Sequence, residues 1–345
     1  MASLLSFLKF SHCEKHDWQS PDNYIHACYT DIAPLYTERG LDKDIWAFAS
    51  GEQSVEYPVL MGVVMYLTAL PLNDIRDYYF LNIFLLALLF IATVFIAQRI
   101  NVYGFYYALA PAVIGSLFIN WDLWGLIPIL AIAARSNRLP IRYLSIFTGT
   151  WLAINLPVAL TTPTGWWHFY KFNMERGPDW GSIWNVGQIF GLTSGNTNFL
   201  SLLGTLAILS WVMVYLFGLK TTPTLAEVSF IVFASALILG KVYSPQYVLW
   251  LTALAVIAIK TKPTLIIFWV WQMAELAYHI AIWQHLALIS EAKFGLAQNF
   301  YGAISLIRLI ASIAMIYSLA RQLSQTRSTQ GKPWDFLFNT ASTYP

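Results

Sequence analysis

Long apolar segments separated by short polar ones make up most of this chain after residue 78. Several of them approach or reach the ~20 residues that an α-helix needs to cross the hydrocarbon core of a bilayer. The pattern predicts an all-α, polytopic transmembrane helical bundle with about nine spans. The predicted spans are Tyr79–Gln98, Val102–Ile119, Leu123–Ala134, Ile141–Leu160, Phe199–Leu219, Thr224–Gly240, Tyr247–Ile259, Leu265–Ile282 and Leu296–Ala320.

A further apolar run, Tyr57–Leu70, is followed directly by Pro71 and is short for a span. We predict a juxtamembrane or re-entrant helix there, which does not cross the membrane. The organisation expected is a first loop with juxtamembrane helices at 1–78, membrane helices at 79–160, a polar loop at 161–195, membrane helices at 196–322 and a polar tail at 323–345.

Composition agrees with a membrane protein. Of the 345 residues, 57% are hydrophobic and 11% are charged, whereas soluble domains have about 25% charged residues. The formal net charge is only +2 and no dense basic run occurs, so a nucleic-acid partner is not expected. The 15 Trp and 19 Tyr residues suit the two water–lipid boundaries of a membrane.

The charged residues divide between the two sides of the predicted bundle. By residue 56 the chain has 9 of its 18 acidic residues against 4 basic ones. The basic residues of the opposite side are Arg99, Arg135, Arg138, Arg142, Lys220, Lys260, Lys262, Arg321, Arg327 and Lys332. Since basic loops stay in the cytoplasm, the first loop, the turn at 120–122, the loop at 161–194 and the turn at 241–246 are expected to share one extracytoplasmic face of the plasma membrane.

The two cysteines, Cys13 and Cys28, both fall in the first loop. On an oxidising face they would form a disulfide, and two free thiols are the alternative. The opening residues lack the basic start and the apolar length of a good signal peptide.

Asp31 is the leading candidate for chemistry. It stands beside Tyr29, Ile32 and Tyr36, surroundings that raise the pKa of a carboxyl by desolvation. A carboxylate that reaches an acceptor hydroxyl can serve as a general base. A solvated or helix-capping carboxylate is the alternative.

Two charged residues near Asp31 have equally open roles. Arg39 could bind a donor phosphate, because guanidinium groups match phosphate oxygens, or it could pair with Asp31 or Glu38. Glu56 precedes the Tyr57–Leu70 helix, so it could bind substrate or stabilise the N-terminus of that helix.

Other candidates lie in the later polar turns. Asp122, next to Asn120, could function in the site or cap a helix that begins at Leu123. Lys241 could hold a lipid phosphate or extend to the interface. In the 161–194 loop, Trp166 and Trp167 could form part of an interfacial belt or contact a sugar.

Arg308 lies well inside the last predicted span, where a charge is costly and needs a partner. Glu275 is the candidate partner, with His279 one turn further along the same helix. Contact between Arg308 and a donor phosphate is the alternative. The histidines look scattered, and no zinc-ligand spacing, glycine-rich phosphate loop or Ser-His-Asp pattern is visible. No cofactor is therefore predicted, although an Asp-based metal site in the first loop stays open.

Several short motifs occur in an ordered set between residues 13 and 250. They are Cys28-Tyr29-Thr30-Asp31-Ile32, Leu35-Tyr36, Arg39-Gly40-Leu41, Glu56-Tyr57-Pro58-Val59-Leu60, Ile119-Asn120-Trp121-Asp122-Leu123, Asn155-Leu156-Pro157-Val158, Phe169-Tyr170-Lys171-Phe172, Glu175-Arg176-Gly177-Pro178-Asp179-Trp180-Gly181-Ser182-Ile183-Trp184 and Ser244-Pro245-Gln246-Tyr247. With these motifs the chain resembles the GT-C superfamily of membrane glycosyltransferases. More narrowly it resembles glycosyltransferase family 87, the actinobacterial polyprenol-phosphate-mannose-dependent mannosyltransferases.

The resemblance implies transfer of a sugar, mannose first, from a polyprenyl-phosphate donor to a lipid or glycan acceptor, without a cofactor. It also implies that an acid of the first extracytoplasmic loop acts as the base, and Asp31 has the matching position. The residues that we predict to bind substrate are Tyr29, Arg39, Glu56, Tyr57, Asn120, Asp122, Trp167, Arg176, Asp179, Lys241, Gln246 and Arg308.

The chain departs from this family in two places. Members usually have a membrane helix before the first loop, and a helix pair with a Lys-x-Tyr-Pro motif before the Asn-Leu-Pro-Val segment. A transporter or lipid flippase, and a non-catalytic reduced member of the family, are therefore the competing interpretations. A transporter would be expected to have inverted repeats and charged, broken helices at mid-membrane.

Overall fold

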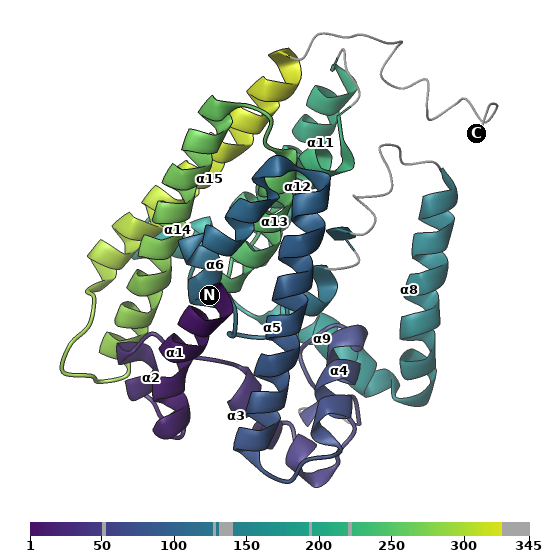
Figure 1. The fold of residues 1–345 in the computed structure, drawn as a ribbon, viewed down its shortest axis with the longest axis vertical. Coiled ribbons are helices and arrows are strands. Elements are labelled where there is room, and N and C mark those ends of the chain that lie inside the picture. Colours follow the sequence, from purple (N-terminus) through teal and green to yellow (C-terminus); the bar gives the residue numbers. More distant parts are fainter. Residues whose placement is uncertain (50–52, 127–128, 131–140, 193–194, 220–222, 326–345) are drawn as a thin grey trace.

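The computed structural model describes residues 1–49, 53–126, 129–130, 141–192, 195–219 and 223–325. Over these ranges all regular secondary structure is helical and no strand occurs (Figure 1). The all-α prediction is therefore confirmed for the described residues. The tail after residue 325 and much of the predicted span Leu123–Ala134 lie outside them.

Four helices are long and apolar enough to cross a membrane. They are α5 (Ile75–Ile100), α11 (Thr197–Phe217), α14 (Lys262–Ile289) and α15 (Gln298–Gln325). Helices α14 and α15 pack against each other as an antiparallel pair on the left of Figure 1. These four helices support a helical membrane protein, whereas nine spans are not confirmed.

The predicted span Val102–Ile119 is wrong. The segment forms a 3-10 helix, η3 (Val102–Leu109), followed by the short helix α6 (Pro111–Ser116). Pro111 has no backbone N–H and is favoured at the first position of a helix, where no donor is needed. Gly104 lies against the backbone of Ala97, leaving no room for a Cβ atom. η3 therefore packs against α5, and α6 follows as a separate short helix that packs against α14, so residues 102–116 do not form one straight helix.

Three other predicted spans are helical but are not among the helices that are both long and apolar enough to cross a membrane. Helix α8 (Ile141–Thr161) forms where it is expected, with Pro157 inside it. Helices α12 (Leu225–Leu239) and α13 (Val248–Ala258) have 15 and 11 residues. At 1.5 Å per residue they extend only ~22 and ~16 Å, less than the ~30 Å hydrocarbon core. Nearly every residue of α13 is buried, so this helix belongs to the protein core.

The polar segments fold into short helices. The first segment contains α1 (Ala2–Lys15), α2 (Asp22–Ile25), α3 (Ile32–Glu38), η1 (Leu41–Lys43) and α4 (Val59–Ala69). Helix α4 has 11 residues, which agrees with a helix that does not span. The segment predicted as a loop at 161–194 instead contains two helices, α9 (Pro163–Glu175) and α10 (Ile183–Ile189). Helices α1–α4 and α9 gather at the lower end of the molecule in Figure 1.

At the end of the bundle away from helices α1–α4 and α9, hydrogen bonds connect the termini of several helices. Asn101, after α5, donates to the carbonyl oxygen of Ile257 at 3.1 Å. Lys260 binds Glu227 of α12 at 2.7 Å, and its backbone N–H donates to Gln322 of α15. The basic residues placed at this end are Arg99, Lys260, Lys262 and Arg321.

These four residues agree with the predicted grouping of basic side chains. The other members of that group, Arg135, Arg138, Lys220, Arg327 and Lys332, lie outside the described residues, as does the side chain of Arg142.

Candidate functional site

A cavity of about 960 Å³ lies at the end of the bundle opposite the basic helix ends. Its walls come from the first polar segment, the turn at 119–122, residues 169–180, the turn at 244–247 and the last turns of α14. The predicted site residues that line it are Tyr29, Asp31, Glu56, Tyr57, Asn120, Asp122, Arg176, Asp179 and Gln246. The expectation that sequence-distant polar segments meet in one place is therefore correct.

Asp31 is placed by contacts between the first segment and the 118–119 turn. Thr30 Oγ1 donates to the carbonyl oxygen of Phe118 at 2.8 Å, and the Asp31 N–H donates to that of Ile119 at 2.7 Å. This pairing sets Asp31 beside Asn120 and Asp122 on the cavity wall. Although Asp31 precedes the first residue of α3, its side chain does not cap that helix.

The Asp31 carboxylate instead accepts a hydrogen bond at each oxygen. Tyr29 donates to Oδ1 at 2.7 Å and Tyr57 donates to Oδ2 at 2.8 Å. Burial raises the pKa of Asp31, the two tyrosine hydrogen bonds oppose that rise, and the charges of Glu56 and Glu38 add to it. Because a carboxylate has about four acceptor positions, each oxygen can still accept a hydrogen bond from the cavity.

Arg39 pairs with Glu56, whereas the two partners considered from the sequence were Asp31 and Glu38; phosphate binding by Arg39 stays a prediction. Its Nε and Nη2 each donate to one Glu56 oxygen at 2.9 Å, a bidentate ion pair. Glu56 does not cap α4, which begins only after Pro58. The pair connects the end of α3 to the segment before α4, and so helps to hold Tyr57 where its hydroxyl reaches Asp31.

Asp122 is a second buried carboxyl on the cavity wall. Its backbone N–H donates to Asn120 Oδ1 at 3.0 Å. Its Oδ2 atom is buried and has no hydrogen-bond partner among the described residues. Burial, together with the charge of Asp31, raises the pKa of Asp122 to about 7. Near neutral pH this group can therefore accept or donate a hydrogen bond.

Arg176 and Asp179 form the wall that follows α9. Arg176 Nη2 donates to Asp179 Oδ1 at 3.2 Å, and Ser244 Oγ donates to Asp179 Oδ2 at 3.0 Å. Among the described residues that line the cavity, Arg176 is the one basic side chain. It is therefore the candidate ligand for an anionic group.

Four predicted binding residues, Arg39, Trp167, Lys241 and Arg308, do not line the cavity. Lys241 Nζ donates to the carbonyl oxygens of Met174 and Arg176 at 3.0 Å and to Asn198. This lysine holds the chain after α9, and phosphate binding by Lys241 stays a prediction. Trp167 is 49% exposed on α9 and stacks on Tyr170.

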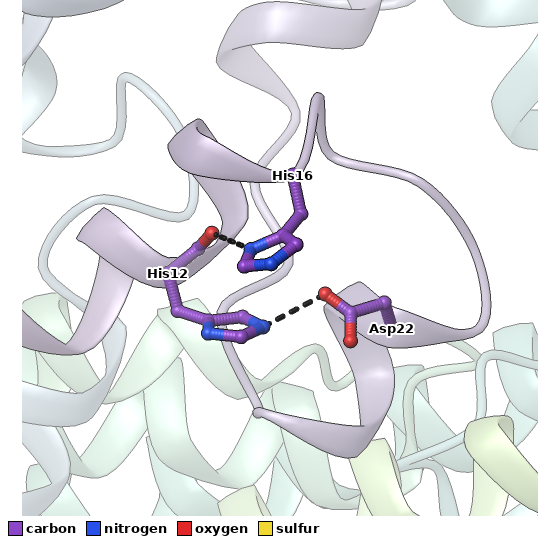
Figure 2. Close-up of side chains that lie close together, drawn as sticks. All are labelled: His12, His16 and Asp22. Atoms are coloured by element: carbon purple, nitrogen blue, oxygen red, sulfur yellow. Dashed lines mark hydrogen bonds and ion pairs between the residues drawn. The ribbon is translucent and has the colours of Figure 1, made fainter.

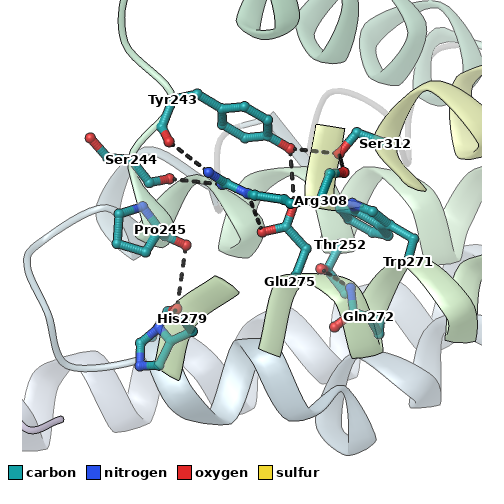
Figure 3. Close-up of polar contacts among 11 residues, drawn as sticks. Tyr243, Ser244, Pro245, Thr252, Trp271, Gln272, Glu275, His279, Arg308 and Ser312 are labelled. Atoms are coloured by element: carbon teal, nitrogen blue, oxygen red, sulfur yellow. Dashed lines mark hydrogen bonds and ion pairs between the residues drawn. The ribbon is translucent and has the colours of Figure 1, made fainter. Parts of the chain in front are cut away.

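Arg308 also lies outside the cavity, fully buried in the bundle (Figure 3). Its Nε donates to Glu275 Oε2 at 2.8 Å, which confirms the expected partner. Its Nη1 donates to the carbonyl oxygen of Tyr243 at 2.8 Å, and the guanidinium lies between the rings of Tyr243 and Tyr278. Arg308 is thus a structural residue that holds the 243–244 segment, and its assignment as a substrate ligand is not supported by this geometry.

The sequence analysis did not identify an aromatic wall of the cavity. Tyr29 lies against Trp283 with 5.0 Å between ring centroids, and Tyr24 stacks on Tyr29 at 5.6 Å. All three rings line the cavity. A tryptophan at the outer end of a predicted span, directly after Ile282, was the available signal for Trp283, but a membrane-boundary role explains such a residue equally well.

An apolar groove of about 440 Å³ adjoins the cavity between α4, α8 and α9. Tyr57, Pro58 and Phe169 line both spaces. Trp166, and not the predicted Trp167, faces this groove, and its Nε1 donates to Asn155 Oδ1 at 3.1 Å. A polar cavity and an apolar groove with shared walls could accommodate a ligand that has both a polar and an apolar part.

The disulfide expected between Cys13 and Cys28 is present, with 5.8 Å between the Cα atoms. It connects α1 to the segment that leads into Tyr29 and Asp31. Comparisons of the chain with protein-family models, with curated proteins and with solved structures find no match.

Proposed function

We propose that this chain is an integral-membrane glycosyltransferase, with mannose the first candidate sugar, a polyprenyl phosphate as donor and a lipid or glycan as acceptor. The observation that supports this most is the carboxylate of Asp31, which two tyrosines orient on the wall of a polar cavity beside an apolar groove. The ordered set of motifs that resembles family 87 contributes this carboxylate and most of the residues around it.

The two adjoining spaces suit the two parts of such a donor. An isoprenoid tail would lie in the groove, whose lining includes Phe48, Trp151 and Ile154. The phosphate would lie in the cavity against Arg176, because a guanidinium can hold phosphate oxygens bidentately. Arg176 would then exchange part of its contact with Asp179 for the ligand.

In the proposed reaction Asp31 takes the proton of the acceptor hydroxyl. The acceptor oxygen forms a bond to the anomeric carbon, while the bond from that carbon to the phosphate oxygen breaks and polyprenyl phosphate leaves with the electron pair. This displacement inverts the anomeric centre. A carboxyl with a raised pKa is a stronger base than an ordinary one, and Arg176 stabilises the charge that develops on the leaving phosphate.

The remaining carboxylates favour a ligand rich in hydroxyl groups. Glu38 and Asp122 line the cavity, and the carboxyl oxygens of both can accept hydrogen bonds. Sugar hydroxyls supply the matching donors. The rings of Tyr24, Tyr29 and Trp283 offer flat apolar surfaces against which a sugar ring can pack.

Two observations support a cavity that faces away from the cytoplasm. The disulfide near the cavity is typical of an oxidising compartment. The basic residues at the opposite end are typical of the cytoplasmic side. We therefore propose that the protein is a multi-pass protein of the plasma membrane with an extracytoplasmic site.

The test is transfer of radiolabelled sugar from polyprenyl-phosphate-mannose in membranes that contain the chain. Removing a general base costs about 10²–10⁴-fold in rate. The transfer rate of Asp31→Asn is therefore expected to fall at least about a hundredfold while its expression stays normal. The matched control is Asp44→Asn. Asp44 is exposed in the same segment and has a φ of 57°, which asparagine tolerates.

Full activity in Asp31→Asn would refute the assignment of the base. Movement of the labelled lipid between leaflets with no new glycosidic bond would identify a transporter instead.

A further inference from the structure

Three of the six histidines, His12, His16 and His26, lie together with the carboxylate of Asp22 where the end of α1 meets the start of α2. Figure 2 shows His12, His16 and Asp22. His12 Nε2 donates to Asp22 Oδ2 at 2.8 Å. One potential ligand atom from each of His12, His16 and Asp22 lies within 4.8 Å of the other two. The expectation of scattered histidines is therefore wrong here, because the turn after α1 folds α2 back onto that helix.

His16 has a ring nitrogen that is free to bind an ion, whereas His12 Nε2 would exchange the proton that it shares with Asp22 for the ion. His16 Nδ1 donates to the carbonyl oxygen of His12 at 2.9 Å, which leaves its Nε2 as a lone-pair nitrogen. His26 Nδ1 lies 3.1 Å from Asp22 Oδ1 and also donates to the backbone carbonyl oxygen of Asp22 at 3.2 Å. It therefore contacts the carboxylate at the oxygen that His12 does not contact. Metal ligands commonly have such orienting contacts from their neighbours.

We propose that His12, His16 and Asp22 bind one zinc-type divalent ion, with water completing the coordination and His26 positioning Asp22. Imidazole nitrogen and carboxylate oxygen are ordinary zinc ligands, and the same set accepts Cu²⁺ or Ni²⁺. Bond lengths of 2.0–2.2 Å in a tetrahedral site place ligand atoms about 3.4 Å apart. In this structure the ligand atoms lie within 4.8 Å of one another. The side chains of His12 and Asp22 are 33% and 35% exposed, so they can rotate to reach the spacing of a tetrahedral site.

The backbone already holds these ligands close together. His12 lies on α1 and His16 is the residue that caps its C-terminal end, and the two rings stack with 4.2 Å between their centroids. Asp22 is the first residue of α2, and the disulfide from Cys13 holds the chain next to His12. A bound ion would tie α1 to α2 beside Asn23 and Tyr24, which line the cavity. The site lies outside the proposed reaction and does not depend on it.

The experiment measures zinc on the full-length protein, purified in detergent through a tag without histidine. The protein is incubated with ZnCl₂, passed through gel filtration, and its metal is counted by mass spectrometry. We expect about one zinc ion per wild-type chain and at most about a tenth of that in His12→Gln/His16→Gln, because the variant loses two of three protein ligands. The matched control, His168→Gln on α9, should retain the wild-type amount.

His26→Gln separates orientation from ligation. Loss of an orienting contact lowers metal affinity about 10–100-fold, so a zinc titration of this variant should show a raised Kd with the stoichiometry unchanged. Addition of Co²⁺ to the wild type should give a d–d absorption spectrum that is absent from the double variant.

Equal zinc on the wild type and the double variant would overturn the proposal, as would a wild-type chain without zinc. An unchanged Kd in His26→Gln would overturn the role of His26. If the double variant does not fold, His16→Gln alone decides the matter, because this side chain is exposed and its hydrogen bond is to the backbone carbonyl oxygen of His12.

Discussion

Replacing Arg308 by methionine would leave the carboxylate of Glu275 buried without its cationic partner. The side chains of Arg308 and Glu275 are 0% and 1% exposed, and the nearest oxygen–nitrogen distance is 2.8 Å. Glu275 would retain hydrogen bonds from Tyr243 at 2.9 Å and from Trp271 at 3.1 Å, but these neutral donors do not balance its charge.

The expected cost follows from the burial of the pair. Breaking a buried ion pair by removing one partner costs about 3–5 kcal/mol. Arg308→Met also loses the hydrogen bonds to the carbonyl oxygens of Tyr243 and Ser244, so a loss in the upper part of that range is expected. Adding Glu275→Gln removes the isolated charge. The double variant should therefore be more stable than the sum of the two single losses predicts, by about 1–3 kcal/mol.

The assay is unfolding of the purified protein in mixed micelles with a denaturing detergent, followed by tryptophan fluorescence. The control is Arg321→Met, an exposed residue near the end of α15, which should change the free energy of unfolding by no more than about 0.5 kcal/mol. A loss below about 1 kcal/mol for Arg308→Met, where a buried pair predicts several, would refute the reasoning. The reasoning would also be refuted if the double variant lost as much free energy of unfolding as the two single variants lose together.

Two further predictions concern the wall around Asp31. Cys28→Ser opens a disulfide between residues 15 positions apart and should lower the free energy of unfolding by about 3 kcal/mol; an unchanged unfolding midpoint would contradict this. Tyr57→Phe removes a hydrogen bond to the charged form of Asp31, so the pKa of Asp31 should rise further. Because the base must be ionised, the acidic limb of the transfer rate should move to higher pH. A bond to a charged group contributes about 1.5–3 kcal/mol, so the rate on that limb should fall about tenfold or more; coincident pH profiles would argue against Asp31 as the base.

The cavity shows how far residue patterns can predict a site. Asp31, Asn120 and Asp122 were identified because short polar segments stand out between apolar runs, and the charge division predicted one face for them. Tyr57 was identified only through the resemblance of its motif. The partner of Arg39 was not predictable in this way. Glu38 is adjacent in the chain, whereas Glu56 is 17 positions away and becomes the partner only when the segment before α4 packs beside the end of α3.

The wrongly predicted span at residues 102–119 also shows what a sequence can and cannot reveal. The apolar composition of residues 102–119 suggests a span, yet Pro111 was a visible reason for a break. What composition could not show is the close approach of Gly104 to the backbone of α5. The choice of Trp166 over Trp167 for the groove likewise depends on how α9 rests against α8, because both residues have the same chemistry.

The sequence by itself determined the all-helical membrane class, four of the spans and the non-spanning length of α4. It left two alternatives for the cysteines and two for Arg308, and the structure shows the disulfide and the pair with Glu275. The length and hydropathy of an apolar segment, and the cost of burying a lone charge in it, are properties of that segment. They can therefore be read from its composition. Only the tertiary structure decided that Lys241 holds a backbone turn, that Arg39 binds Glu56 and that three histidines meet at Asp22. Hydrogen bonds and metal ligands need atoms within about 3–5 Å, and such distances are set by the packing of segments that are far apart in the chain.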